Sequence, residues 1–148
     1  KERCPEIVRE TKRRSARKPE SIKKRQEYYR RRLDSDINFR VRGALRSRVG
    51  AAIRADGGMK SKKTMELVGC SIETLKNWLE MNFKPGMTWD NWGQGGWSID
   101  HIRPCSAFDL SDPEQQRVCF HYANLQPLWE SENIRKSDSL DYEPDFQI

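Results

Sequence analysis

The segment from residue 36 to residue 58 has the clearest pattern in the chain, with an apolar residue at every fourth position. The pattern predicts an amphipathic helix that Asp36 caps at its start and that Gly57 and Gly58 end. The apolar face consists of Ile37, Val41, Leu45, Val49 and Ile53. The remaining surface carries five arginines with no acidic residue between Asp36 and Asp56, namely Arg40, Arg42, Arg46, Arg48 and Arg54. An ordinary solvated face would be of mixed charge, so these arginines favour phosphate contact.

Charge is divided unequally along the 148-residue chain. Residues 1–63 hold 22 Lys and Arg against 8 Asp and Glu, whereas residues 64–148 hold 6 against 14. Positive charge concentrated on one segment attracts a polyanion, so nucleic acid, an anionic membrane face and acidic protein are the candidate partners. No run of about 18 apolar residues occurs and no signal-peptide pattern opens the chain. We therefore expect an intracellular, cytoplasmic protein that works without a membrane.

The unequal charge also predicts that the chain has two parts. A chain of 148 residues can build only one modest core, so the basic segment is expected to extend outside it. Residues 1–63 are expected to form a basic, mostly helical extension that binds nucleic acid. Within it, residues 1–20 are interpreted as a flexible or loosely helical arm and residues 21–33, capped by Ser21, as a solvated basic helix. Residues 64–148 are expected to form an α+β domain with an acidic, irregular tail.

The second part contains signals for three helices and two short strands. A core helix begins at the Ser71 cap, and a second helix has Pro113 at its first position. A third covers residues 130 to about 137. The alternating runs 97–102 and 124–129 predict the strands, and Pro127 predicts an edge or bulged position for the second of them. The inward-facing residues expected for the core helix are Ile72, Leu75, Trp78 and Leu79.

Cysteines and tryptophans in this part are interpreted as structural. No C-x-x-C pair occurs among Cys4, Cys70, Cys105 and Cys119, so no structural zinc site is expected. Cys105 and Cys119 could form a disulfide, but reduced thiols packed as small hydrophobes are favoured. The tryptophans at positions 89, 92 and 97 could stack on bases, but filling the core and pinning loops is favoured.

Four polar residues follow one another in an order that suits phosphodiester cleavage. Asp100 and His101 end the first strand, Asn124 opens the second, and Asn133 lies in the last helix. Cleavage needs a base that titrates near neutrality, which histidine provides, and a cation near the departing oxygen, which carboxylate and amide oxygens can hold. Consecutive side chains of a strand point to opposite faces, so Asp100 and His101 should not share one ion. The carboxylate is the natural ligand for Mg²⁺, which leaves the imidazole as the base.

These residues occur in three short motifs, DHIRP at 100–104, NLQPL at 124–128 and ENIRK at 132–136. Their order, including the nine-residue step from Asn124 to Asn133, resembles the HNH endonuclease family, in particular its D-H…N…N branch in phages and mobile elements. The resemblance covers roughly residues 64–138. It implies a ββα-metal fold at about residues 97–138, within an HNH nuclease domain spanning residues 64–148.

The resemblance also implies a role for each matching residue. His101 is the general base, and Asp100 and Asn133 hold a single divalent ion, with Mg²⁺ expected first and Mn²⁺ or another ion as alternatives. Asn124 ties the loop between the strands and orients the catalytic histidine. Lys136 occupies a basic position where either phosphate contact or interaction with the helix dipole is expected. The other histidine, His121, is expected to be structural or a helix cap, and the products carry a 5′-phosphate and a 3′-hydroxyl.

Together these features predict a metal-dependent hydrolase acting on double-stranded DNA, held by Lys136 and by the arginines at 40, 42, 46, 48 and 54. Nicking, homing and phage roles are all compatible with this prediction. The alternative is a non-catalytic or RNA-associated nucleic-acid-binding module within a larger assembly. No coiled-coil seam indicates a dimer, so the oligomeric state is left open.

Overall fold

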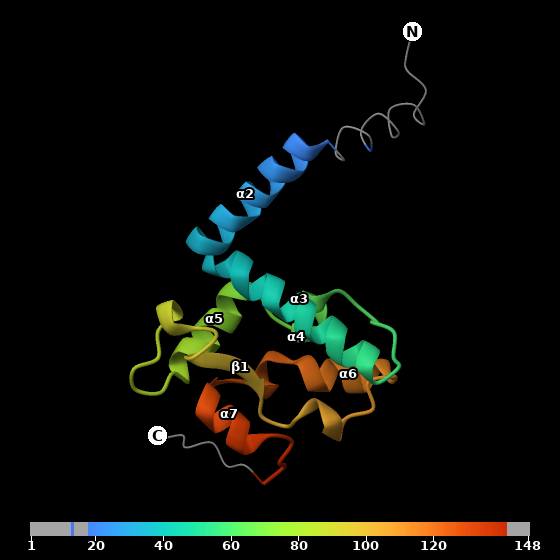
Figure 1. Ribbon diagram of the computed structural model, residues 1–148. Coiled ribbons are helices and arrows are strands. Elements are labelled where there is room, and N and C mark those ends of the chain that lie inside the picture. Colours follow the sequence, from blue (N-terminus) through green and yellow to red (C-terminus); the bar gives the residue numbers. More distant parts are fainter. Residues whose placement is uncertain (1–12, 14–17, 142–148) are drawn as a thin grey trace. The chain divides into compact units, whose positions relative to one another are not determined.

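The computed structural model describes residue 13 and residues 18–141, which divide into two compact units between Arg40 and Val41 (Figure 1). The sequence instead predicts a division after residue 63. The difference arises because the second half of the arginine-rich helix belongs to the C-terminal core, where Val49 and Ile53 pack with Phe120. Most of the arm expected at residues 1–20 and the end of the acidic tail lie outside the described residues.

The first unit contains helix α2, Pro19–Ser35, and the first turn of helix α3, Ile37–Ala55. α2 starts before the predicted Ser21 cap because Pro19 occupies the first turn, where its missing N–H costs nothing. No residue of α2 is buried, as expected for a solvated helix. Asp36 caps α3 as predicted, since its carboxylate accepts the Phe39 N–H at 2.9 Å. A second partner, the Arg32 guanidinium, lowers the pKa of Asp36.

The apolar stripe of α3 forms one wall of the second unit's core. Four of its five predicted members, Val41, Leu45, Val49 and Ile53, are buried. The helix ends as predicted, with Gly57 at φ 73° and the Gly58 N–H bonded to the Ile53 carbonyl at 2.9 Å. A Cβ atom at Gly58 would lie 2.5 Å from the Leu110 carbonyl oxygen, so only glycine fits where this turn passes the 110 loop.

Four further helices complete this unit, and one of them is not predicted. α5 (Ile72–Met81), α6 (Pro113–Phe120) and α7 (Glu130–Lys136) match the expected helices. Ser71 caps α5 through the Thr74 N–H, and Asp112 caps α6 through the Glu114 N–H. The fourth, α4 (Thr64–Val68), is not predicted because it is too short to carry a periodic signal.

Strands β1 (Trp97–His101) and β2 (Leu125–Trp129) form a two-stranded antiparallel sheet in which His101 lies opposite Leu125. Backbone bonds from Ile102 to Asn124 and from Glu130 to Gly96 extend the ladder at both ends. This register turns the backbone of Pro127 away from β1, so its missing N–H disrupts no bond, as predicted for an edge position. On the outer edge of β1, Arg48 donates to the Ile99 carbonyl.

Trp97 lies buried where the loop before β1 folds over the sheet. Its indole N–H donates to the Thr88 carbonyl at 2.6 Å, and its ring packs 5.1 Å from that of Trp89 and 6.1 Å from that of Trp92. Trp97 therefore fills the core, as the favoured interpretation predicts, whereas Trp89 and Trp92 are only half-buried and pack against it from the loop.

The second unit combines helices with a small antiparallel sheet and so belongs to the predicted α+β class. Two 3₁₀ turns, at Cys105–Ala107 and Tyr122–Asn124, flank α6 in the connection between the strands. Among the residues that the structure describes, no helix is long and apolar enough to cross a membrane.

Candidate functional site

Strand β1 directs Asp100 and His101 to opposite faces of the sheet, as alternation requires. Asp100 faces α7, where its carboxylate contacts Lys136. His101 faces α6, with its ring centroid 5.6 Å from that of Phe120. We refer below to the α7 face, which carries Ser98 and Asp100, and to the α6 face, which carries His101.

Asp100 is held on the α7 face by a buried ion pair. Its Oδ2 lies 3.0 Å from Lys136 Nζ and accepts a hydrogen bond from Gln126 Nε2 at 3.3 Å. The side chain of Lys136 is only 1% exposed and that of Asp100 is 13% exposed. This position of Lys136 differs from the predicted phosphate contact, because the lysine lies on the inward side of α7 and there pairs with Asp100.

Asn133 lies on the same side of α7 as Lys136, since residues three apart share a helix face. Its Nδ2 donates to Ser98 Oγ at 3.4 Å. The two predicted metal ligands, Asp100 and Asn133, therefore both lie between β1 and α7. Carboxylate and amide oxygens suit a hard cation such as Mg²⁺. The cation would use Asp100 Oδ1 and Asn133 Oδ1, because Lys136 and Gln126 already hold Asp100 Oδ2.

Asn124 links the loop after β1 to the end of α6. Its Oδ1 accepts the Arg103 N–H at 2.9 Å, and its Nδ2 donates to the Arg103 carbonyl at 3.1 Å and to the Cys119 carbonyl at 2.8 Å. Its own backbone carbonyl accepts the Ile102 N–H at 2.8 Å. These bonds fix the chain directly after His101, which is the structural task that the family resemblance implies for this asparagine.

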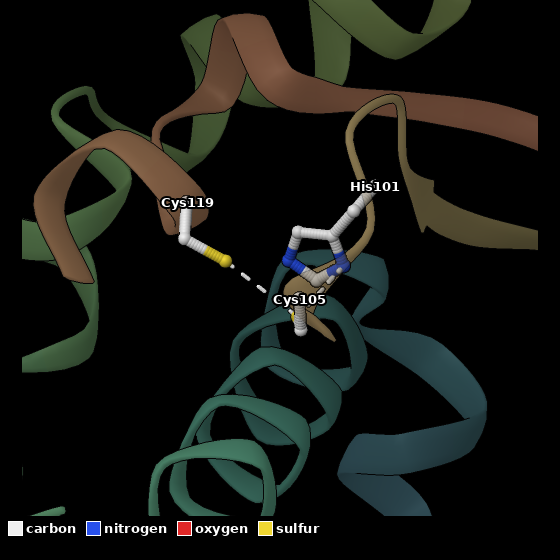
Figure 2. Close-up of side chains that lie close together, drawn as sticks. All are labelled: His101, Cys105 and Cys119. Carbon is white, nitrogen blue, oxygen red and sulfur yellow. Dashed lines mark hydrogen bonds between the residues drawn. The ribbon is translucent and has the colours of Figure 1, made fainter. Parts of the chain in front are cut away.

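On the α6 face, His101 lies beside two cysteines that come from different elements (Figure 2). Its Nδ1 is 3.7 Å from the sulfur of Cys105, which lies in the 3₁₀ turn after β1. The Cys105 sulfur is in turn 3.6 Å from that of Cys119 in α6. The other ring nitrogen, Nε2, is buried and has no hydrogen-bond partner within the described part of the chain.

The two thiols of this cluster differ in ionisation. The Cys119 S–H donates to Cys105 and, together with His101 and Arg48, lowers the pKa of Cys105 to about 5 against the opposing effect of burial. The same bond, together with burial, raises the pKa of Cys119. At neutral pH the pair therefore consists of a Cys105 thiolate and a Cys119 thiol.

The cluster of His101, Cys105 and Cys119 is the part of this region that the sequence does not predict. The three-residue gap between His101 and Cys105 is not distinctive, and Cys119 joins them only because α6 folds back against the end of β1. Burial of Cys119 agrees with the expected reduced thiol. What the sequence does not predict is that the imidazole of His101 lies beside the two thiols.

The predicted phosphate-binding arginines differ in their exposure to solvent and in their contacts. Arg42, Arg46 and Arg54 are exposed on the second unit's part of α3. Arg48 is exposed too, but its guanidinium also donates to Ile99. Arg40 is half-buried in the first unit and has contacts there.

His121 has the capping role that the sequence predicts. Its Nδ1 accepts the Ala123 N–H at 3.3 Å at the start of the second 3₁₀ turn. It also lines a groove of about 660 Å³ together with Arg103 and Asn124. The lining of this groove includes neither Asp100 nor His101, so the groove is separate from the predicted catalytic pair.

Two uncharacterized proteins of Acanthamoeba polyphaga mimivirus are similar to this chain. One is 40% identical over 125 residues, which are 84% of this chain and 54% of the relative. The other is 38% identical over 109 residues, which are 74% of this chain and 47% of the relative. The chain thus spans about half the length of the curated relatives it matches. No family model and no solved structure matches the chain, so a functional assignment depends on its own residues.

Proposed function

We propose that the chain is a metal-dependent endonuclease of the HNH type that hydrolyses phosphodiester bonds of double-stranded DNA. The observation that carries the proposal is the joint placement of Asp100 and Asn133 between the antiparallel β1–β2 pair and α7. This arrangement agrees with the ββα architecture and the ligand pair that the three sequence motifs imply. Asn124, bonded to the loop after His101, supports the same proposal.

Each residue of the α7 face has a defined task in this proposal. A bound Mg²⁺ supplies positive charge near the departing oxygen of the phosphate. Asp100 and Asn133 would hold the ion, and Lys136 and Gln126 fix the Asp100 carboxylate through Oδ2. Lys136 therefore positions a ligand and does not bind phosphate itself.

His101 takes the proton from the attacking water, and the structure limits how it can do so. Nε2 is the nitrogen without a partner, but it is buried on the α6 face. His101 lies on the face of β1 opposite to Asp100, so its imidazole would have to leave the α6 face to reach a water bound near the ion. The proposal therefore requires that DNA binding exposes this ring.

The DNA backbone is held by the exposed arginines of α3, of which Arg42 and Arg46 are the clearest examples. Contacts to phosphate give affinity and position the duplex without reading its sequence. Binding should weaken steeply as salt concentration rises.

The direct test is cleavage of supercoiled plasmid with Mg²⁺ or Mn²⁺. Wild-type protein should produce nicked or linear DNA, and His101→Ala should be slower by about 10²- to 10⁴-fold because a general base is lost. His121→Ala is the matched control, since this second histidine caps a turn and lies outside the predicted catalytic pair. Equal rates for His101→Ala and wild type would refute the assignment of the base. Absence of product from wild type with every metal would refute the nuclease proposal.

A non-catalytic nucleic-acid-binding module is the second candidate. It is favoured by one feature of this structure, namely that Asp100 is paired with Lys136 while His101 Nε2 is buried. Such a module would shift DNA in a gel yet release no product at any pH or with any metal. Competition between duplex DNA and structured RNA of equal length separates the DNA-binding and RNA-binding versions of this candidate.

A further inference from the structure

The α6 face gathers an imidazole and two sulfur atoms from three separate elements. His101 ends β1, Cys105 lies in the following 3₁₀ turn, and Cys119 comes from α6 (Figure 2). Their ligand atoms all lie within 4.8 Å of one another. We propose that His101, Cys105 and Cys119 form a binding site for Zn²⁺, distinct from the Asp100–Asn133 side of the sheet.

The spacing of the three groups is close to that of a tetrahedral zinc site. Zn–S bonds of about 2.3 Å and Zn–N bonds of about 2.0 Å place neighbouring tetrahedral ligands roughly 3.5 to 3.8 Å apart. The Cys105 and Cys119 sulfurs are 3.6 Å apart, and Cys105 Sγ is 3.7 Å from His101 Nδ1. The remaining side of the triangle, between His101 and Cys119, is at most 4.8 Å long and would close to roughly 3.5 Å around an ion.

The buried Nε2 of His101 is a second observation that points to a ligand. A buried polar atom without a partner is unfavourable, and structures rarely leave one unsatisfied. Figure 2 shows the imidazole facing the two sulfurs, so a metal between these groups could be bound by either ring nitrogen. Coordination through Nε2 would satisfy the unpaired atom, and it is the alternative to coordination through Nδ1, to which the 3.7 Å spacing from Cys105 applies.

The donor set selects the metal class. Two sulfurs and one imidazole nitrogen prefer a soft or borderline ion such as Zn²⁺, whereas the carboxylate and amide oxygens of the α7 face prefer Mg²⁺. The cluster has no fourth His, Cys, Asp or Glu in the described part of the chain, so a water would complete the coordination of Zn²⁺.

Occupation of this site has a consequence that rests on the proposed function. A metal on His101 takes the lone pair that the general base needs, so Zn²⁺ should inhibit cleavage even when Mg²⁺ is saturating. Metal binding itself does not depend on nuclease activity. The two proposals can therefore fail separately.

Titration of the reduced, metal-free full chain with Co²⁺ tests the site directly. We expect one Co²⁺ per chain, with a thiolate-to-metal charge-transfer band and the visible bands of a tetrahedral ion, both lost when Zn²⁺ displaces Co²⁺. Cys105→Ser should weaken Co²⁺ binding by at least about 100-fold. Replacing a residue that only hydrogen-bonds to a metal ligand already lowers metal affinity by about 10- to 100-fold, and Cys105 is proposed as a ligand itself. Cys70→Ser is the matched control, since Cys70 is a half-buried free thiol outside the cluster. Circular dichroism of each variant shows whether it folds.

Two outcomes would overturn the zinc site. One is a wild-type spectrum that lacks the charge-transfer band, and the other is a folded Cys105→Ser variant that titrates like wild type. Plasmid cleavage with Mg²⁺ gives a second readout, in which Zn²⁺ should inhibit wild type strongly and should inhibit Cys105→Ser much less, each compared with its own rate without Zn²⁺. Tetrahedral Co²⁺ binding by a protein that cleaves no DNA would support the zinc site and refute the nuclease proposal.

Discussion

The two faces of the β1–β2 sheet differ in chemistry although they share one strand. The α7 face carries oxygen donors and the buried Asp100–Lys136 ion pair, whereas the α6 face carries an imidazole, a thiolate and a thiol. The difference begins with two adjacent residues, Asp100 and His101, that alternation sends in opposite directions. It teaches that the two residues of a D-H dipeptide at a strand end can lie in two environments, one with oxygen donors and one with nitrogen and sulfur donors.

The largest expected effect concerns the ionisation of Cys105 on the α6 face. Its pKa is lowered to about 5 by the Cys119 hydrogen bond, so the thiolate persists as pH falls from neutral and is lost only near pH 5. Ultraviolet thiolate absorbance of metal-free protein should show this step. Cys105→Ser should lack it, whereas Cys70→Ser should retain it because burial raises the pKa of Cys70. A wild-type thiolate that appears only at alkaline pH would contradict the described hydrogen bond.

The next effect concerns the ion pair of the α7 face. Asp100→Asn leaves the Lys136 charge buried without its partner, which should reduce the free energy of unfolding by about 3 to 5 kcal/mol. Urea denaturation measures this loss. The double variant Asp100→Asn, Lys136→Met should recover most of it, because the unpaired charge is removed. Because Asp100 variants are expected to be less stable, their cleavage rates must be compared with that of wild type at the same concentration of folded protein. A loss below about 1 kcal/mol for the single variant would argue that the pair is not buried.

A smaller loss of stability is expected at Asn124, which links the loop after β1 to the end of α6. Asn124→Ala removes three side-chain hydrogen bonds and leaves the Arg103 N–H and the Cys119 carbonyl without this partner. We expect a loss of about 2 to 3 kcal/mol in the free energy of unfolding, measured with urea. Asn77→Ala, at an exposed position of α5, is the control and should stay within about 0.5 kcal/mol of wild type. Equal stability of the two variants would show that Asn124 does not tie the loop.

The smallest effect is expected from a single arginine of α3. Arg46→Ala should weaken DNA binding several-fold and reduce the slope of log affinity against log salt by about 1, because one phosphate contact is lost. Fluorescence anisotropy at several salt concentrations measures both quantities. Arg117→Ala is the control, since this exposed arginine of α6 pairs with Glu114. An unchanged slope for Arg46→Ala would remove α3 from the DNA-binding surface.

Local signals account for the parts of the fold that the sequence predicts. The buried stripe of α3 follows from periodicity, the start of α6 from Pro113, and the edge position of Pro127 from the missing N–H. The opposite orientation of Asp100 and His101 follows from strand alternation alone. In each case the responsible interaction lies within a few residues of the signal.

Features that depend on tertiary packing are the ones the sequence misses. Lys136 finds Asp100 only because α7 packs on the sheet, and Cys119 reaches Cys105 only because α6 folds back on β1. The α4 helix is five residues long and too short for a periodic signal. The catalytic roles of His101, Asp100 and Asn133 stay predictions, since a resemblance assigns roles and a fold alone does not.

The central claim is that the α7 face holds the ion that cleavage needs, and Asn133 tests it most directly. Its one described side-chain contact, to Ser98, is long at 3.4 Å, so Asn133→Ala should fold while losing a ligand. The Mg²⁺ dependence of plasmid cleavage is measured for this variant and for Ile134→Ala, a control at a neighbouring position that is 74% exposed. We predict that Asn133→Ala needs at least about 10-fold more Mg²⁺ for half-maximal cleavage and that Ile134→Ala behaves like wild type. Cleavage by Asn133→Ala at the wild-type rate at every Mg²⁺ concentration would contradict the claim.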